Sequence, residues 1–173
     1  MNLNIYNNYN NYNLLSVSRT QSSTNFKANS IKMVKDLKLA NLYGTETLGK
    51  VKLKDELVDV THTGNEFFTL NKDGKMLGFM YMSPRMYNGK TCYSCGELRN
   101  DSDKKGVGTK LLQIGLKAHK DSGKTGEFRV HDVLLEAEEF YEKLGFVEDV
   151  NRAEQWYLPF ENEHILEKYN GGL

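Results

Sequence analysis

The spacing of hydrophobic residues along the chain changes from a period of two to a period of about 3.6 near residue 100. Before this point, short alternating or β-rich stretches predict strands at residues 66–70, 75–83 and 91–99. Asp73-Gly74 and Asn88-Gly89 separate these stretches, and such pairs favour the positive φ angles of tight hairpin turns. We expect Pro84 to end the second strand, so that residues 66–99 form a three-stranded antiparallel meander.

The segment before this meander has a weaker pattern. Residues 31–42 have apolar positions that are only partly in helical register, and they predict one amphipathic helix. Val58 and Val60 alternate with polar residues, which is typical of a strand.

After residue 100 the pattern predicts two helices and three further strands. The helices cover residues 107–119 and 136–144, with Gly145 as the C-terminal cap of the second. The strands lie at residues 126–131, 146–150 and 154–159. This order indicates a mixed α/β (α+β) fold in which helices pack on a sheet.

Composition restricts the protein to a few classes. The chain has 173 residues with 39% hydrophobic content, which suffices for one domain. No apolar run approaches the roughly 18 residues of a membrane span, so we expect no membrane partner. Four of the 23 basic residues and none of the 23 acidic ones lie in residues 1–35, so the remainder has a net charge of −4. A mildly acidic body disfavours nucleic acid as a partner.

The first 30 residues form a polar, low-complexity segment of Asn-Tyr repeats followed by Ser and Thr. Such a segment has too few large apolar side chains to offset the entropy of ordering, so it predicts a disordered tail. The single domain then covers residues 31–173. We expect a cytoplasmic protein; the acid-free tail leaves export or organelle targeting as the alternative.

Cys92 and Cys95 have the spacing C-x-x-C, which occurs in redox sites and in half of a zinc site. No second cysteine pair exists, and positions three apart on a strand point to opposite faces about 10 Å apart. The sequence therefore predicts two inert thiols and no metal.

The clearest chemical signal is Lys104-Lys105-Gly106-Val107-Gly108-Thr109, which opens the first long helix. Glycines let a backbone approach a phosphate closely, and the first N–H groups of a helix have no partner within it. The two lysines add positive charge, and the Thr109 hydroxyl can donate in the first turn. This motif predicts an anion site.

About 30 residues later the chain has Phe140-Tyr141-Glu142-Lys143-Leu144-Gly145-Phe146. Together, in this order, the two motifs resemble the GNAT superfamily of acyl-CoA-dependent N-acetyltransferases over about residues 66–159. The resemblance implies a mostly antiparallel sheet of six to seven strands, a splay between two central strands, and helices on both faces.

The resemblance also implies acetyl-CoA as co-substrate and no metal cofactor. Its pyrophosphate would bind the loop that the family writes Arg/Gln-x-x-Gly-x-Gly/Ala, here Asp103, Lys104, Lys105, Gly106, Val107 and Gly108, with Thr109. The pantetheine arm would pass the splayed strand near Gly96, Glu97 and Leu98, where Gly96 suits a bulge. Phe140 and Tyr141 would lie near the thioester.

Several positions depart from the family pattern. Asp103 stands where Arg or Gln is usual, and Leu134 stands where an Asn often contacts the coenzyme. Cys92 occupies a position at which some members have a glutamate base. Asp103 and Leu134 favour a second hypothesis, a non-catalytic acyl-CoA-binding or regulatory module on the same fold, whereas the intact Tyr141 disfavours it.

The main hypothesis is an N-acetyltransferase in which a primary amine attacks the thioester directly. By resemblance, Tyr141 protonates the leaving thiolate. Glu97 is the first candidate for the base, His131 and Asp132 are next, and a bound water could relay the proton. The acceptor would be a small-molecule amine or an amine of a protein, bound by residues 30–65 and the closing strands around Trp156. A monomer or a homodimer fits equally.

Overall fold

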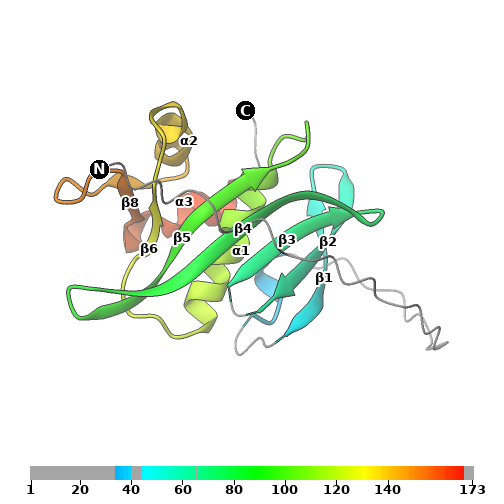
Figure 1. The fold of residues 1–173 in the computed structure, drawn as a ribbon, viewed down its shortest axis with the longest axis horizontal. Coiled ribbons are helices and arrows are strands. Elements are labelled where there is room, and N and C mark those ends of the chain that lie inside the picture. Colours follow the sequence, from blue (N-terminus) through cyan, green and yellow to red (C-terminus); the bar gives the residue numbers. More distant parts are fainter. Residues whose placement is uncertain (1–33, 40–43, 65, 170–173) are drawn as a thin grey trace, which may run out of the picture.

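The computed structural model describes residues 34–39, 44–64 and 66–169, and in this part of the chain the strands form one eight-stranded sheet (Figure 1). The strand order is β1-β2-β3-β4-β5-β6-β8-β7, and only the β5–β6 pair is parallel. The mixed α/β fold is confirmed, with eight strands where six to seven were expected. The predicted tail, residues 1–30, lies outside the described residues.

The elements have the following bounds. The strands are β1 Thr45–Leu53, β2 Glu56–Thr63, β3 Phe67–Lys72, β4 Lys75–Tyr87, β5 Lys90–Asn100, β6 Phe128–His131, β7 Val147–Glu148 and β8 Gln155–Leu158. The α-helices are α1 Val107–Asp121, α2 Glu138–Lys143 and α3 Glu163–Lys168. Short 3-10 turns cover Val34–Asp36, Leu135–Ala137 and Phe160–Asn162. None of the described helices combines the length and hydrophobicity that crossing a membrane requires.

The predicted meander is confirmed as β3, β4 and β5. Both hairpin turns have the positive φ angles that their sequences favour: Asp73 and Gly74 at 51° and 77°, Asn88 and Gly89 at 50° and 75°. The prediction that Pro84 ends its strand is wrong, because β4 continues to Tyr87 and pairs with β5 throughout. Pairing of β3 with β4 stops at Tyr81, so the proline lies on an edge where a missing N–H is tolerated.

The helix predicted at residues 31–42 is wrong over the residues that the structure describes. Only Val34–Asp36 form a 3-10 turn, and residues 37–39 are not helical. Leu37 and Leu39 are both buried, and the Leu39 N–H donates to the Asp121 carboxylate at 3.3 Å. Packing against α1 therefore determines the conformation here, where the helical pattern was weak. The hairpin of β1 and β2 had been only partly recognised, from Val58 and Val60.

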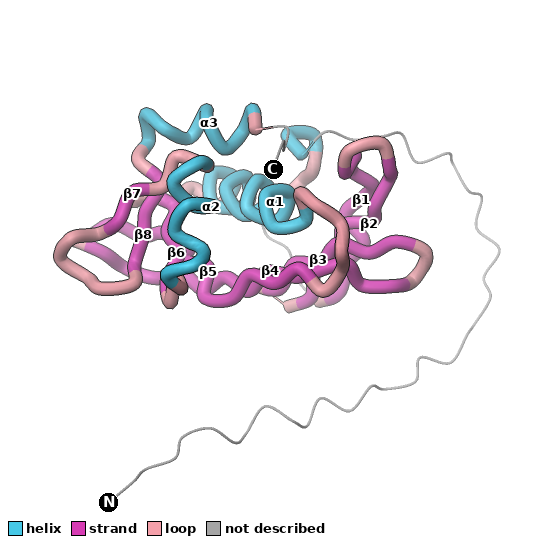
Figure 2. The backbone as a smooth tube through the Cα atoms, turned by 90° about the horizontal axis from the view of Figure 1, so that it is seen from above, coloured by secondary structure: helices cyan, strands magenta, loops and turns pink. Residues whose placement is uncertain are grey.

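The described helices lie on the same side of the sheet, seen edge-on in Figure 2. α1 packs across β3, β4 and β5, and Gly115 brings it close: a Cβ there would lie 2.8 Å from Met80 Cε and 2.9 Å from Phe128 Cζ. The opposite face has no helical cover among the described residues, which departs from the expected cover on both faces. This layer places the start of α1 above the centre of the sheet.

Two connections fix the parts that matter for the site. Gly145 ends α2 at φ 92°, and the Phe146 N–H donates to the Tyr141 carbonyl at 3.1 Å, as expected of a glycine C-cap. β5 and β6 pair only at Ser94–Arg129 and Cys95–Val130 and separate beyond these residues. This separation is the predicted splay.

Gly96 lies at the start of the splay and forms the predicted bulge. Tyr81 of β4 pairs with Glu97, but the next residue, Met82, pairs with Cys95, so Gly96 has no partner of its own on β4. A bulge turns the strand locally, which moves the end of β5 away from β6.

Gly78 of β4 anchors the start of α1. An added Cβ would lie 2.3 Å from the Arg99 carbonyl oxygen and 2.7 Å from Val107 Cγ1. We predict that Gly78→Ala lowers the free energy of unfolding by about 1–3 kcal/mol, because the Arg99 backbone cannot move aside for the new methyl group as a flexible side chain could. Urea unfolding measures this, with exposed Lys75→Ala as the control. A Gly78→Ala protein as stable as the control would contradict the packing described.

Candidate active site

The N-terminus of α1 is open to a ligand. Gly106 is the N-cap residue at φ 91°, a left-handed conformation that favours glycine, and no side chain caps the helix. The first intrahelical bond runs from the Lys110 N–H to the Gly106 carbonyl at 2.9 Å. The N–H groups of Val107, Gly108 and Thr109 therefore have no helical acceptor, and they carry the positive end of the helix dipole.

The loop that leads into α1 is held by Asn100. Its Oδ1 accepts from the Ser102 N–H at 3.1 Å and hydroxyl at 2.9 Å, while its Nδ2 donates to the Lys104 carbonyl at 2.9 Å. Val107, the first helical residue, is fully buried against Gly78. The loop is thus fixed at both ends before any ligand binds.

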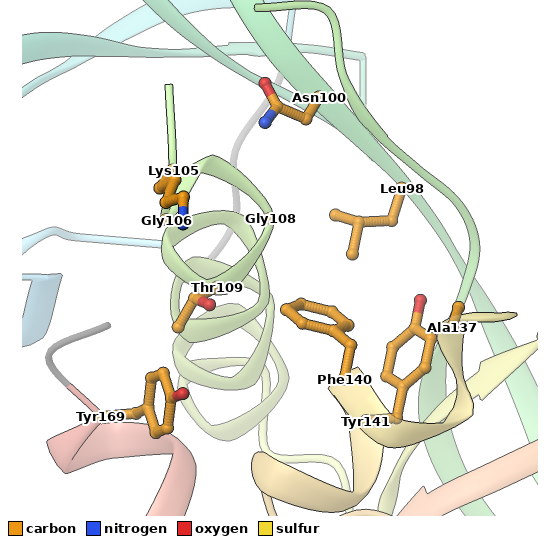
Figure 3. A pocket seen from close by; sticks show the side chains of 10 residues that line it. All are labelled: Leu98, Asn100, Lys105, Gly106, Gly108, Thr109, Ala137, Phe140, Tyr141 and Tyr169. Carbon is orange, nitrogen blue, oxygen red and sulfur yellow. The ribbon is translucent and has the colours of Figure 1, made fainter. Parts of the chain in front are cut away.

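A pocket of about 380 Å³ opens beside this helix start (Figure 3). It is lined by Leu98, Asn100, Lys105, Gly106, Gly108, Thr109, Ala137, Phe140, Tyr141 and Tyr169. Seven of the residues proposed from the sequence therefore line one pocket, although they come from β5, from α1 and the loop before it, and from α2.

Gly108 keeps the middle of this pocket open. An added Cβ would lie 3.5 Å from Phe140 Cζ and 3.6 Å from Leu98 Cδ2, in ordinary contact with both. Any side chain here would therefore occupy the space between α1, α2 and β5.

Tyr141 is the most buried titratable group of the pocket. Its side chain packs edge-on against Phe140 and Phe146, and its hydroxyl points toward the side of the pocket where Leu98 lies (Figure 3). Burial raises the pKa of Tyr141 well above its usual value, and the nearby Cys95 thiolate would raise it further. The phenol is therefore protonated at any physiological pH.

Cys92 and Cys95 are free thiols, and both are buried. Burial raises the pKa of Cys95 to about 12 and also raises that of Cys92. A thiol with so high a pKa is a poor nucleophile. Among the described residues, His, Cys, Asp and Glu side chains form no group of three that could hold a metal ion.

Three residues of the predicted phosphate loop do not line the pocket. Asp103 is exposed, and the Val107 side chain belongs to the core. The Lys104 ammonium binds the Glu56 carboxylate at 2.6 Å, and Lys72 binds the same carboxylate at 2.8 Å. Lys104 thus joins the loop to β2, whereas Lys105 lines the pocket.

Gly96 and Glu97 lie on the other face of the sheet from this pocket. Leu98 pairs with Met80, which faces α1, while the exposed Glu97 pairs with Tyr81. A Cβ on Gly96 would lie 2.7 Å from His131 Cε1. The His131 Nδ1 is 2.9 Å from the Asp132 carboxylate. The candidates for the base therefore gather at the open face of the splay, and Tyr141 lies on the helical face.

The sequence did not identify Asn100, Ala137 and Tyr169 as pocket residues. The polar run after residue 99 was a signal for Asn100, but nothing in the pattern pointed to Tyr169. The Gln113 side-chain amide donates to the carbonyls of Leu166 and Tyr169, both at 2.9 Å, and so holds α3 against α1. Trp156, around which the closing strands were expected to border the acceptor, is buried in the core.

The comparisons with known proteins concern the family and the fold. A model of the acetyltransferase (GNAT) domain matches residues 63–148. Among solved structures, the chain is similar to a tyrosine-to-phenylalanine mutant of the toxin AtaT bound to the C-terminus of the antitoxin AtaR. The two are 17% identical over 63% of this chain and 72% of that one, with a TM-score of 0.50.

A second structure of that mutant, bound to the antitoxin C-terminus and acetyl-CoA, is 18% identical over 65% of this chain and 74% of that one, with a TM-score of 0.44. No match is found among curated proteins. The structural likeness concerns the fold alone.

The Glu56 cluster gives a direct test of how the loop is held. Hydrogen bonds from Lys104 and Lys72 lower the pKa of Glu56 from 4.5 to about 2. Because the folded pKa is depressed, the stabilisation is present above pH 4.5 and is lost as the pH falls toward 2. We predict that Lys104→Ala raises this pKa more than Lys72→Ala does. NMR titration of the side-chain carboxyl measures it, and a wild-type midpoint near 4.5 would contradict the cluster.

Proposed function

The chain belongs to the GNAT superfamily of acetyltransferases, and we propose that it transfers an acetyl group from acetyl-CoA to a primary amine by direct attack. One observation carries this proposal: the uncapped start of α1 and the buried Tyr141 hydroxyl open into the same pocket. An anion site thus lies next to a protonated acid, as a phosphate-bearing thioester requires.

In this proposal the pyrophosphate of acetyl-CoA binds the N–H groups of residues 107–109. The helix dipole and the Lys105 ammonium favour its charge, and the Thr109 hydroxyl can donate to it. Asp103 offers only its backbone, and Lys104 contributes by holding the loop through Glu56. The pantetheine arm follows Leu98, where the edge of β5 no longer pairs with β6.

The chemistry needs no covalent enzyme intermediate. The neutral amine nitrogen forms a bond to the thioester carbon, and the resulting tetrahedral intermediate collapses by breaking the C–S bond. Backbone N–H groups near Leu98 polarise the carbonyl oxygen. The thiolate takes the Tyr141 proton, and the tyrosine regains the proton that the nitrogen loses as the amide forms. The proton that made the acceptor an ammonium leaves before the attack.

A buried tyrosine with a raised pKa is a weak acid, but the leaving group experiences the same environment. Burial raises the pKa of the neighbouring Cys95 thiol to about 12, and a coenzyme thiol beside Tyr141 would be desolvated in the same way. The pKa values of Tyr141 and of the coenzyme thiol therefore rise together, and the free-energy change for proton transfer from the tyrosine to the thiolate stays small.

Gly108 provides the test of coenzyme binding. We predict that Gly108→Ala raises the free energy of unfolding by up to about 1 kcal/mol, because alanine favours a helix and its Cβ meets only ordinary contacts. The same methyl group narrows the pocket, so acetyl-CoA should bind roughly tenfold more weakly, a loss of about 1.4 kcal/mol. Calorimetry measures the stability and the affinity for acetyl-CoA, and Gly108→Val repeats the test with a larger side chain. Wild-type affinity in both variants would show that the coenzyme lies elsewhere.

Tyr141 provides the test of catalysis. We predict that Tyr141→Phe binds acetyl-CoA like wild type but lowers kcat about 10²-fold or more, because the thiolate then leaves without a proton donor. Thiol release from acetyl-CoA with a panel of amines measures the rate. Tyr93→Phe is the matched control, since Tyr93 packs on His119 outside the pocket. Wild-type binding without turnover of any amine would instead favour the non-catalytic acyl-CoA-binding module.

A further inference from the structure

We propose that His131, oriented by Asp132, is the base that removes the proton from the acceptor amine, and that this acceptor approaches from the open face of the sheet. The inference rests on the proposed acetyl transfer and names its missing residue. An alkylammonium has no free electron pair, so it must lose a proton before its nitrogen can attack the thioester.

The position of His131 follows from the splay. Val130 and Cys95 are the last paired residues of β6 and β5, and His131 and Gly96 are the residues that follow them. The ring lies over the bulge, because a Cβ on Gly96 would come within 2.7 Å of Cε1 and 2.8 Å of Nε2. Only a glycine therefore leaves room for the imidazole at the mouth of the gap.

The hydrogen bond to Asp132 sets the protonation of the ring. When the imidazole is neutral, its Nδ1–H donates to the carboxylate at 2.9 Å, so that Nε2, on the edge of the ring next to Gly96, carries the free electron pair. Asp132 holds this position with φ 58°, a left-handed conformation that is uncommon for a residue other than glycine. Its own side chain is 76% exposed, so a proton taken up by His131 has a short way to solvent.

The acid and the base flank the gap from opposite faces. Phe128 packs on α1, so its neighbour Arg129 and, two residues on, His131 face away from the helices. Tyr141 and the proposed coenzyme site lie on the helical side, and no described helix covers the other face (Figure 2). A thioester placed in the gap would thus receive the amine on one side and release the thiolate on the other.

The structure favours His131 over Glu97, the first candidate from the sequence. Glu97 is exposed on β5, whereas the His131 side chain is only 21% exposed and has an orienting partner. The charged groups of this face include Asp132, Glu97 and Arg99 on β5, Arg85 on β4 and Arg129 on β6, and β8 presents the neutral Gln155 opposite His131.

The decisive kinetic experiment compares His131→Asn with Glu97→Gln. The probes are spermidine and a lysine peptide as acceptors, with thiol release from acetyl-CoA as the measurement. We expect His131→Asn to lower kcat/KM by about 10²–10⁴-fold at pH 7 with unchanged affinity for acetyl-CoA. The defect should shrink as the pH approaches 10, where the amine loses its proton unaided. Glu97→Gln should lose far less than His131→Asn does, and exposed Lys75→Ala, which lies outside the site, is the control with wild-type rates.

Asp132 has a positioning role, and its test is separate. Asp132→Asn should lower kcat with little change in KM and shift the acidic limb of the pH profile, and Asp132→Glu should recover part of the rate. Side-chain ¹⁵N NMR of His131 should show the Nδ1–H tautomer in the wild-type protein and a shift toward Nε2–H in Asp132→Asn.

The outcomes separate the inference from the function on which it rests. Wild-type rates in His131→Asn with a loss in Glu97→Gln, or an Nε2–H tautomer in the wild-type protein, would overturn the role of His131 alone. A wild-type protein that binds acetyl-CoA and acetylates none of the amines would overturn the acetyl transfer itself, and the base with it.

Discussion

β5 and β6 are hydrogen-bonded at two residue pairs only, Ser94–Arg129 and Cys95–Val130, and the features of the site depend on this short contact. Beyond it, among the described residues, the edge of β5 that faces β6 has no strand paired to it near Leu98. The bulge at Gly96 turns β5 away from β6. If the two strands stayed paired, β6 would cover the edge of β5 at Leu98, and Leu98 could not border a pocket. The separation thus leaves the β6 side of β5 open next to the pocket.

The second constraint is the close fit of α1 on the sheet. Gly78 and Gly115 let the helix approach β4, so the side chain of Val107 is buried and the N–H groups after Gly106 open toward the pocket. Burial then acts on the chemistry at the other end of the pocket, where it raises the pKa of Tyr141 and of Cys95. One layer of packing therefore positions the anion site and also desolvates the acid.

The sequence predicted the meander, both Gly-containing turns, α1 and the glycine cap of α2, because each has a strong local signal. It failed at residues 34–39, where packing of Leu37 and Leu39 outweighs a weak helical pattern, and at Pro84, whose tolerance depends on where β3 ends. The two motifs identified six pocket residues, and the family spacing of the preceding strand added Leu98. The sequence could not predict that Lys104 binds Glu56 and does not line the pocket, because this ion pair joins residues far apart in the chain. It also could not predict that Glu97 and His131 lie on the face opposite the pocket, because this depends on the bulge and on strand pairing.

The central claim is that the unpaired N–H groups at the start of α1 bind the pyrophosphate of coenzyme A. Titration of the ¹⁵N-labelled protein with coenzyme A, followed by amide NMR, tests it most directly. The account predicts that the amide protons of Val107, Gly108 and Thr109 shift downfield together and saturate with the ligand, as expected of N–H groups that donate to phosphate. Saturable binding that leaves these three resonances unmoved, while amides elsewhere shift, would contradict it.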